Sequence, residues 1–371
     1  MTVAEELSRT DWDDVRLALY SKTTTDVMSA LQRPARHWQD FLALISPAAE
    51  AFLPDMAAKA QALTRQRFGH TVSLFVPLYL SNLCANECTY CGFTMSNKIK
   101  RTKLTMAEIS EEVYAIKKMG FDSVLLVTGE HETKAGMDYF LEAIELVRAH
   151  FSHVAMEVQP LSTDEYRALA AAGTDSVLVY QETYHRAHYA EYHLRGKKQD
   201  FDWRLATPDR LGEAGMNKIG LGALLGLSEW RTDSAFTALH LSLLQQRYWK
   251  SRYSVAFPRI KPCAGDRATQ KSQVSDKQLI QLICAYRLCF PEVELSLSTR
   301  ESPAFRDNVV PLAINQLSAA SQTQPGGYSA PTTALEQFST EDTRSASAVA
   351  NSLTARGLDP VWTDWLNAFG R

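Results

Sequence analysis

The 371-residue sequence lacks an apolar run of the roughly 18 residues that a membrane-spanning helix requires, and its first residues, Met1 to Asp14, are acidic and polar. It also lacks an excess of positive charge, because 39 Lys and Arg stand against 42 Asp and Glu for a formal net charge of −3. These absences predict a cytoplasmic protein without a signal peptide or membrane segment. They argue against a nucleic-acid partner and favour a small-molecule substrate.

Cysteine is scarce, and six cysteines in a reducing compartment argue against a disulfide framework. Cys284 and Cys289 lie in an apolar run that is typical of small buried side chains on a helix. Cys263 follows a proline in a predicted loop and receives no assigned role. The remaining three fall within eight residues of one another, at Cys84, Cys88 and Cys91.

The sequence has no low-complexity linker and no fixed-period repeat, and its 45% hydrophobic and 22% charged residues are ordinary for a globular protein. Residues 1–70 are predicted to form a helical N-terminal extension, residues 71–330 a barrel, and residues 331–371 a C-terminal helical segment packing on that barrel. In the middle region short β-branched runs alternate with amphipathic helical stretches, which predicts a parallel α/β sheet with right-handed crossovers. Eight such runs predict a closed (β/α)8 barrel of the TIM type, with a partial six-stranded barrel as the fallback. The predicted strands are Val72–Leu80, Ser123–Val127, Val154–Val158, Ser176–Val179, Lys218–Ala223, Tyr253–Phe257, Glu294–Leu297 and Ile314–Leu317.

Polar, glycine-containing and ionisable residues follow these strands, at the end where such barrels build their active sites. The segments that follow the strands include Asn82–Cys91, Thr128–His131, Gln159–Pro160, Gln181–His185, Gly222–Gly226, Arg259–Pro262, Thr299–Glu301 and Gln324–Tyr328. Their clustering predicts that the site lies at the carboxyl end of the barrel.

The cysteine triplet predicts a metal site. Zinc sites usually need four ligands, commonly in two separated pairs, and no second Cys/His pair stands at an obvious distance here. Iron–sulfur cubanes are held by thiolates, usually four, so three thiolates leave one iron open to a bidentate ligand. A zinc-stabilised, non-catalytic barrel stays as the alternative from a different functional class.

The spacing Cys84-Ala-Asn-Glu-Cys88-Thr-Tyr90-Cys91 resembles the radical S-adenosylmethionine (SAM) superfamily. The resemblance implies a [4Fe-4S] cluster on the three cysteines, with SAM bound at the open iron. It also implies contacts to SAM from other residues. These are Tyr90 at the adenine, the turn Thr128-Gly129-Glu130 at the methionine amino group, Glu157 at the ribose hydroxyls, and Gly220 and Gly222 on a strand beside the adenine. Without the resemblance, Tyr90 is equally a packing aromatic, Glu157 a solvated residue and the glycines a tight strand end.

Longer segments resemble the aromatic amino-acid lyases of this superfamily. Three families compete: the tyrosine lyase of bacterial thiamine biosynthesis (2-iminoacetate synthase), the [FeFe]-hydrogenase maturase, and the tryptophan lyase of thiopeptide biosynthesis. The maturase adds a C-terminal domain with a second cysteine cluster, whereas here no cysteine follows Cys289. Segments Gln181–His185 and Gln324–Tyr328 favour the tyrosine lyase, with the tryptophan lyase or a related aromatic amino-acid lyase as the alternative. The segments that carry the resemblance are Tyr79–Cys84, Leu126–His131, Tyr180–His185, Gly196–Asp200, Gly220–Ala223, Ser298–Glu301 and Gln324–Tyr328.

The tyrosine-lyase resemblance implies that a hydrogen is taken from the amino group of L-tyrosine and that the Cα–Cβ bond then breaks. The products are p-cresol and 2-iminoacetate (dehydroglycine), the latter used for thiazole formation in thiamine biosynthesis. A one-electron donor of the flavodoxin or ferredoxin type is also implied, and a complex with thiazole synthase is compatible with the unstable imine. Such chemistry needs a water-excluded cavity and a firmly held amino acid.

Arg300 is the predicted partner of the substrate carboxylate, because its planar fork grips a carboxylate with two hydrogen bonds. The alternative for Arg300 is an ion pair with Glu301 or another acid. Arg204 and Lys261 are weaker candidates for carboxylates, and a metal site on His185, His188 and His193 is a minor alternative. The other predicted substrate-binding residues are Ser298, Thr299, Glu182, Tyr184 and His185, and no catalytic residue is assigned.

Overall fold

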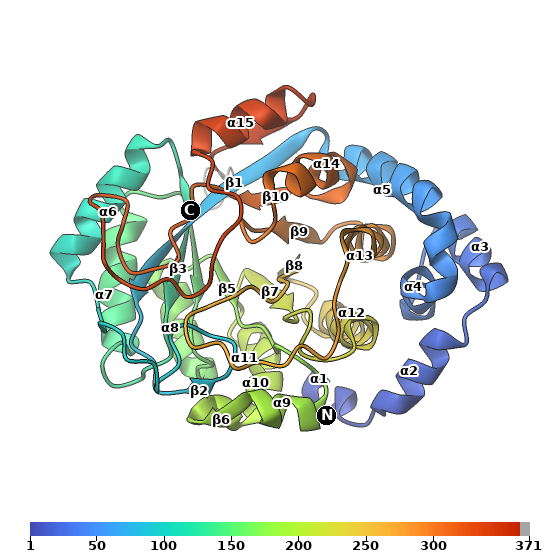
Figure 1. Cartoon of the computed structure of the whole chain (residues 1–371), viewed down its shortest axis with the longest axis horizontal. Coiled ribbons are helices and arrows are strands. Elements are labelled where there is room, and N and C mark those ends of the chain that lie inside the picture. The colour runs from blue at the N-terminus through green and yellow to red at the C-terminus, as the bar shows by residue number, and fades with distance from the viewer. Residues whose placement is uncertain (364–371) are drawn as a thin grey trace.

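Eight parallel strands close into a barrel in the computed structural model, which describes residues 1–363 (Figure 1). Hydrogen-bonded neighbours follow the chain order around the barrel, and pairing of the last strand with the first closes it. The predicted (β/α)8 barrel is therefore confirmed, and the six-stranded fallback is not needed. The strands are β1 (Thr71–Ser81), β3 (Ser123–Thr128), β4 (His153–Glu157), β5 (Ser176–Leu178), β7 (Lys218–Gly222), β8 (Arg252–Ala256), β9 (Glu294–Leu297) and β10 (Gln316–Ser318).

Helices connect the strands and cover the outside of the barrel. Several begin at a capping box, as at Thr105 with Glu108, where the two side chains satisfy backbone N–H groups that the first turn leaves free. Apolar residues at helical spacing face the strands, so the periodicity that predicted these helices is also what packs them. The barrel helices are α6 (Met106–Lys118), α7 (Met137–Arg148), α8 (Thr163–Ala172), α9 (Arg186–Tyr192), α10 (Phe201–Leu205), α11 (Thr207–Glu213), α12 (Trp230–Arg247), α13 (Asp276–Cys289) and α14 (Pro303–Ala313).

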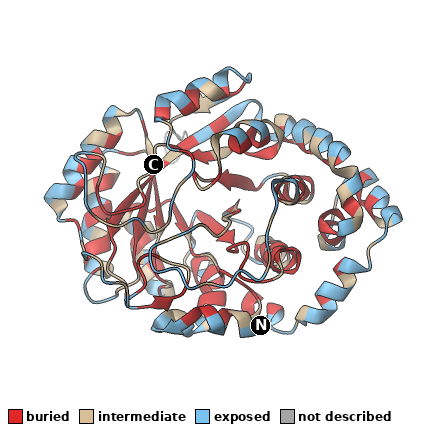
Figure 2. Ribbon diagram, viewed as in Figure 1, coloured by how far each residue is buried: buried red, intermediate tan, exposed pale blue. Residues whose placement is uncertain are grey.

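The N-terminal residues form a helical layer outside α12, α13 and α14 (Figure 1). Its outward faces are exposed and its inward faces buried (Figure 2). Among residues 1–363 no single helix is long and apolar enough to span a membrane, although the bent pair Trp38–Ile45 and Pro47–Phe68 meets the criteria of length and composition when taken together. The elements of the layer are α1 (Val3–Leu7), α2 (Trp12–Tyr20), α3 (Thr24–Gln32), α4 (Trp38–Ile45), the 3-10 helix η1 (Pro47–Phe52) and α5 (Leu53–Phe68).

The C-terminal residues return over the carboxyl end of the barrel. The main chain of Gln337 bonds to Gly92 and Thr323, and the N–H of Glu341 donates to the carbonyl of Thr299. Helix α15 (Ala346–Thr354) and strand β11 (Asp359–Val361) follow, and β11 pairs with the start of β1. The predicted C-terminal segment thus contains a helix and an unpredicted strand, and its last residues, 364–371, lie outside the described part. The three domain boundaries stay a prediction.

Small and polar side chains occupy many inward positions of the barrel. Typical barrels fill this space with layers of large branched residues. Here Ala155, Ser176, Ser254 and Ser296 line a central cavity instead. The interior is hollow along its axis, which leaves room for a ligand beneath the loops of the carboxyl end.

Candidate active site

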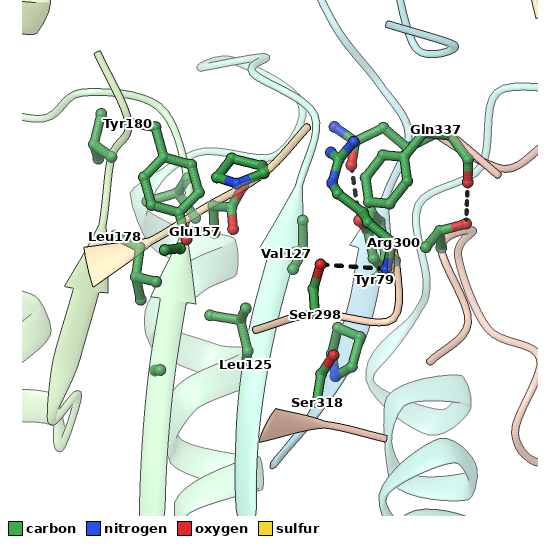
Figure 3. Close-up of a pocket in the computed structure, with 18 of the residues that line it drawn as sticks. Tyr79, Leu125, Val127, Glu157, Leu178, Tyr180, Ser298, Arg300, Ser318 and Gln337 are labelled. Carbon is green, nitrogen blue, oxygen red and sulfur yellow. Dashed lines mark hydrogen bonds between the residues drawn. The ribbon is translucent and has the colours of Figure 1, made fainter. Parts of the chain in front are cut away.

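A cavity of about 210 Å³ extends from the cysteine loop into the barrel. Figure 3 shows Glu157 and Tyr180 on one side of it and Ser298, Arg300, Tyr79 and Gln337 on the other. The structure brings most of the sequence-predicted site residues together around this one cavity. Those that line it are Cys84, Cys88, Tyr90, Cys91, Thr128, Gly129, Glu130, Glu157, Glu182, Ser298, Thr299 and Arg300.

The cysteine loop is joined to the turn after β3 by main-chain hydrogen bonds. The N–H of Ala85 donates to the carbonyl of Glu130 at 2.8 Å, and the N–H of Gly129 donates to the carbonyl of Ser81 at 2.8 Å. A Cβ atom at Gly129 would lie 2.3 Å from the carbonyl oxygen of Leu83, so only glycine permits this approach. The predicted glycine–glutamate turn therefore fixes the position of the loop that carries the thiols.

The three thiols have the chemistry that an iron–sulfur cluster requires. Burial raises the pKa of Cys84 to about 11 and raises the pKa of Cys88 and Cys91 as well, so each thiol keeps its proton until a metal displaces it. Within residues 1–363 no three His, Cys, Asp or Glu side chains converge on one ion position, which is the arrangement that zinc requires. In a cubane each thiolate binds a different iron, so convergence on one point is not needed. The residues fit a cluster better than a zinc ion.

Two carboxylates and two cations form a buried charged cradle beside the cysteine loop. Arg204 Nη1 lies 3.1 Å from Glu130 Oε1, and Lys198 Nζ lies 2.8 Å from Glu182 Oε1. Burial raises the pKa of both carboxyls, but the charges of Arg204 and Lys198 outweigh it and hold both pKa values below the usual range. Asn86 Nδ2 donates to Glu130 Oε2 at 2.7 Å, which connects the cradle to the cysteine loop.

The backbone at Glu182 is in a left-handed conformation, with φ of 71°. A residue other than glycine adopts this region only when its surroundings fix it, and such strain is concentrated at functional sites. Here the N–H of Leu224 donates to the carbonyl of Glu182 at 2.8 Å, and the N–H of Gln181 donates to the carbonyl of Gly222 at 3.2 Å. These bonds to the segment after β7 hold the Glu182 carboxylate toward Lys198.

Tyr90 is fixed by a hydrogen-bond relay from the short hairpin of β2 (Glu87–Cys88) and β6 (His193–Arg195). His193 Nδ1 lies 2.7 Å from the carbonyl of Tyr189, so this nitrogen carries the proton and Nε2 is an acceptor. The Tyr90 hydroxyl donates to that Nε2 at 2.7 Å. The ring of Tyr90 is thereby held as one wall of the cavity.

A second relay reaches the third cysteine. The Tyr79 hydroxyl donates to Gln337 Oε1 at 2.7 Å (Figure 3), and Gln337 Nε2 lies 3.8 Å from Cys91 Sγ. Tyr79 lies near the end of β1, and Gln337 lies in the segment between β10 and α15 that crosses the barrel, here called the C-terminal strap. The relay therefore joins the barrel to this strap.

Arg300 is a cation in the cavity wall without a carboxylate partner among the described residues. Its Nη1 donates to the main-chain oxygen of Arg259 at 3.3 Å, and its guanidinium carbon lies 3.3 Å from the centroid of the Phe338 ring. The predicted alternative, a pair with Glu301, is wrong, because Glu301 accepts from Arg259 Nε at 3.0 Å. Arg300 therefore keeps its charge available to the cavity.

Glu157 lies across the cavity from Arg300 and forms no ion pair with a residue in the described chain (Figure 3). Burial, together with the nearby charge of Glu182, raises the pKa of Glu157 to about 7. Its carboxyl group therefore changes charge near neutral pH. The strand-end position was predicted, but the prediction of a merely solvated residue is not met, since the side chain faces the cavity.

The two glycines of β7 pack against side chains that follow or belong to the neighbouring strand β5. A Cβ atom at Gly220 would lie 2.4 Å from the side chain of Leu178, and one at Gly222 would lie 3.0 Å from the ring of Tyr180. Neither glycine lines the cavity, whereas Leu178 and Tyr180 do. The glycines make room for these two side chains, and contact of SAM with Gly220 and Gly222 stays a prediction.

Tyr184 and His185 do not face the cavity, and the expectation that they do is corrected. The N–H of Tyr184 donates to Asp233 Oδ1 at 2.7 Å, and its hydroxyl lies 3.0 Å from Nδ1 of His240 on helix α12. These bonds turn Tyr184 outward into the layer between strands and helices. His185 caps helix α9 and stacks on His188 at 3.8 Å between ring centroids.

The other minor alternatives do not form metal or carboxylate sites of their own. His193 is committed to Tyr90 and Tyr189, away from the stacked pair, so the three histidines share no metal. Lys261 pairs with Glu341 in the C-terminal strap. Arg204 does meet carboxylates, although they belong to the protein.

Three functional positions were not assigned from the sequence. Lys198 lies in the segment Gly196–Asp200, which carried the family resemblance but no assigned role. Asn86 lies inside the cysteine loop, and Gln337 lies in the strap after β10. The sequence signal that could have identified Lys198 was its place in the motif Gly196–Asp200. Gln337 carries no such signal, because only the fold brings it close to Cys91.

Comparison with known proteins agrees with this geometry. Residues 78–237 match the model of the Radical SAM superfamily, and residues 256–359 match that of the Biotin and Thiamin Synthesis associated domain. The chain is 58% identical to the 2-iminoacetate synthase of Escherichia coli (strain K12) over all of this chain and 98% of that protein. It is 57% identical to the 2-iminoacetate synthase of Salmonella typhimurium, again over all of this chain and 98% of the relative. A crystal structure of HydG, a maturase of the [FeFe]-hydrogenase, superposes with a TM-score of 0.87 at 28% identity, covering all of this chain and 80% of HydG.

Proposed function

We propose a division of labour among the cavity residues of this chain, which belongs to the 2-iminoacetate synthase family of radical SAM enzymes. The chain is a carbon–carbon lyase that cleaves the Cα–Cβ bond of L-tyrosine to give p-cresol and 2-iminoacetate for thiazole formation. It uses a [4Fe-4S] cluster and SAM. The observation that carries the residue assignments is that three buried thiols, a charged cradle and the unpaired Arg300 line one cavity.

Cys84, Cys88 and Cys91 would hold the cluster, and the cradle would hold the methionine end of SAM. When bound, the cluster and SAM supply one-electron chemistry, the reductive cleavage of SAM to a hydrogen-abstracting radical. The Glu130 carboxylate is ionised and suits the methionine ammonium group, and Lys198 suits the methionine carboxylate. Both groups already have protein partners in the cradle, so they are oriented before the ligand arrives.

The nucleoside end of SAM would lie between Tyr90 and Glu157. The hydroxyl of Tyr90 is committed to His193, so its ring is available as a flat apolar surface for the adenine. The Glu157 carboxyl has no competing ion pair with any of residues 1–363, and it suits the two ribose hydroxyls. Thr128 supports this placement, since its buried Oγ1 has no hydrogen-bond partner within the described protein.

Arg300 would bind the carboxylate of tyrosine, with Ser298 and Thr299 beside it. The stacking of its guanidinium on Phe338 restricts the fork to one plane, which favours a bidentate grip. Holding the carboxylate of tyrosine also restricts the position of its amino group, so that one hydrogen of that group lies within reach of the hydrogen-abstracting radical. Glu182 was predicted as a substrate contact, and its pairing with Lys198 assigns it to the cradle instead.

The apolar part of the cavity would exclude water from the reacting atoms. Leu125 and Val127 from β3 and Leu178 from β5 project inward and line the cavity below the loops (Figure 3). By excluding water they would protect a reactive intermediate, such as the imine product, from hydrolysis.

The partners follow from the reaction. A one-electron donor of the flavodoxin or ferredoxin type would reduce the cluster, and thiazole synthase would take up the imine, in a direct complex or by release. A cytosolic location is part of the proposal, because six free thiols are typical of a reducing compartment.

Anaerobic reconstitution with iron and sulfide, followed by assay with tyrosine and tryptophan in separate reactions, tests the proposal. We expect a broad visible absorbance that bleaches with dithionite, and p-cresol from tyrosine. Formation of indole-derived products from tryptophan, without p-cresol from tyrosine, would show that the chain is a tryptophan lyase instead. Absence of the absorbance after reconstitution, with one zinc bound per chain, would contradict a radical enzyme altogether.

A further inference from the structure

The outer face of the cysteine loop is basic. Residues 92–105, which directly follow Cys91, contain four Lys and Arg and no Asp or Glu. Lys98 and Lys100 are exposed, and neither forms an ion pair with a side chain of the described residues. In a chain whose net charge is −3, this loop is a local concentration of positive charge.

Two exposed hydrophobic side chains lie at the same surface. Met95 is 44% exposed and Leu194 is 43% exposed, and both are among the large apolar residues that the structure leaves outside its core. The N–H of Met95 donates to the carbonyl of Asn86 at 2.9 Å, between the first two cysteines. Exposed Arg195 follows Leu194, and it is the residue of β6 that stands opposite Glu87 of β2 in the backbone register of the short hairpin. We call this surface the cluster-loop patch and define it as Met95, Lys98, Lys100, Leu194 and Arg195.

The loop beneath the patch is rigid. Arg101 donates to four main-chain carbonyls, those of Asn82 at 2.8 Å, Phe93 at 2.8 Å, Thr94 at 2.7 Å and Asn97 at 3.2 Å. The guanidinium of Arg101 therefore binds main-chain oxygens inside the loop, whereas the side chains of Lys98 and Lys100 are exposed to solvent. A surface ordered before binding loses little entropy when a partner docks.

Two carboxylates close to the patch have cationic partners outside it. Glu87 accepts from Ser96 and forms an ion pair with Arg267. Glu132 pairs with Lys197, with 2.5 Å between Oε2 and Nζ. Neither carboxylate therefore forms an ion pair with Lys98, Lys100 or Arg195, whose charges face an approaching acidic protein.

We propose that the cluster-loop patch is the docking surface for an acidic protein that carries a one-electron redox group. Exposed apolar side chains together with unpaired cations are the composition of a transient interface with an acidic partner. The thiols line the cavity on the inner side of the same loop, so a partner here docks on the loop that carries the cluster ligands. One electron passes from the reduced donor to the oxidised cluster, and no atoms are transferred. The inference rests on the proposed function, since only a redox enzyme needs such a donor.

The test compares the parent with the charge-reversed variant Lys98→Glu/Lys100→Glu/Arg195→Glu, both reconstituted anaerobically. Reduced flavodoxin is the probe, and three quantities are measured: its affinity, the rate at which it bleaches the cluster absorbance, and the dependence of both on ionic strength. The matched control is Lys59→Glu/Lys250→Glu, which reverses exposed lysines on helix α5 and in the loop before β8.

At low salt we expect the affinity of the patch variant for flavodoxin to be at least about tenfold lower than that of the parent, and its cluster to bleach at least about tenfold more slowly. Both differences should be smaller at high salt. Reduction by dithionite, a small molecule that needs no docking, and p-cresol formation driven by it should stay at the parent level. Unchanged flavodoxin affinity and bleaching in the patch variant would overturn the proposal. It would also be overturned if the variant lost binding to thiazole synthase alone. If the parent itself formed no p-cresol with dithionite as the reductant, the proposed function would be contradicted. The affinity for flavodoxin would still report on docking.

Discussion

The two ends of the barrel contain buried charges that are balanced in opposite ways. At the amino end, Lys218 Nζ lies 2.8 Å from Glu294 Oε2, and Arg252 Nη2 lies 3.1 Å from Glu294 Oε1. Lys218 lines the floor of the cavity. At the carboxyl end Arg300 and Glu157 line the same cavity and neither has an ion-pair partner among the residues described.

This difference distinguishes charged groups that stabilise the fold from charged groups that are available to a ligand. A buried charge is expensive unless it is paired, so a self-paired group at the floor needs no ligand. An unpaired group is tolerated where a ligand completes it, and such groups mark functional sites. The cradle of Glu130 and Lys198 lies between these cases, because its charges balance one another and still face the cavity.

Breaking the pair at the floor should have the largest effect on stability. Lys218→Met leaves the buried Glu294 with Arg252 as its only cation, so the free energy of unfolding should fall by about 3 kcal/mol. The KM for tyrosine should change little, because the floor lies on the far side of the cavity from Arg300. Denaturant unfolding and steady-state kinetics measure the two quantities.

The double variant Lys218→Met/Glu294→Leu is the control, since it removes both charges and should recover most of the lost stability. The exposed Lys59→Met on helix α5 should be neutral. A large increase in the KM for tyrosine with unchanged stability in Lys218→Met would reverse the comparison and make the floor part of the binding site.

Removing the unpaired cation at the carboxyl end should give the opposite result. Arg300→Ala deletes a charge-assisted interaction worth about 1.5–3 kcal/mol, so the KM for tyrosine should rise by roughly 10- to 150-fold. The free energy of unfolding should change by less than about 1 kcal/mol, because no protein carboxylate loses its partner. SAM cleavage in the absence of tyrosine should persist.

Arg300→Lys is the matched variant for the geometry of the fork. It keeps the charge and loses the planar pair of donors, so its KM should fall between those of the parent and Arg300→Ala. Tyrosine binding that survives Arg300→Ala unchanged would show that another residue holds the carboxylate.

The sequence was informative wherever a local pattern determines structure. All eight barrel strands were predicted, because each is a short apolar run before or after an amphipathic helix. Cys84, Cys88 and Cys91 were found because their spacing within one loop is itself the signal. The carboxyl-end location of Glu157 and Arg300 followed from strand order alone.

Side-chain direction within a turn could not be predicted in this way. Glu182 and Tyr184 are two residues apart, yet one faces the cavity and the other faces helix α12. The cause is long-range: Lys198 pairs with the first, and Asp233 holds the backbone of the second. The contact between Gly220 and Leu178 on the neighbouring strand could not be predicted either, because only the register of β5 and β7 reveals it.

The smallest expected effect concerns the pH dependence of the carboxyl end. Burial raises the pKa of Glu157 to about 7, so its carboxyl is neutral below that pH and ionised above it. A carboxylate accepts stronger hydrogen bonds than a neutral carboxyl or an amide. If Glu157 meets the ribose hydroxyls, the affinity of the parent for SAM should rise by about threefold to tenfold between pH 6 and pH 8. In Glu157→Gln the affinity should be flat across this range.

The sign of the accompanying stability change provides an independent check. Because the folded-state pKa lies above the unfolded value, protonation favours the folded state at low pH, and this contribution is lost as the pH rises through about 7. Glu157→Gln cannot ionise, so its stability relative to the parent should increase from pH 5 to pH 8. Glu130, whose pKa is held below the usual range, is the contrast, since Glu130→Gln should weaken SAM binding equally at pH 6 and pH 8. A pH slope that persists in Glu157→Gln would assign the titration to another group, and the proposed ligand contacts at the carboxyl end would then rest on Arg300.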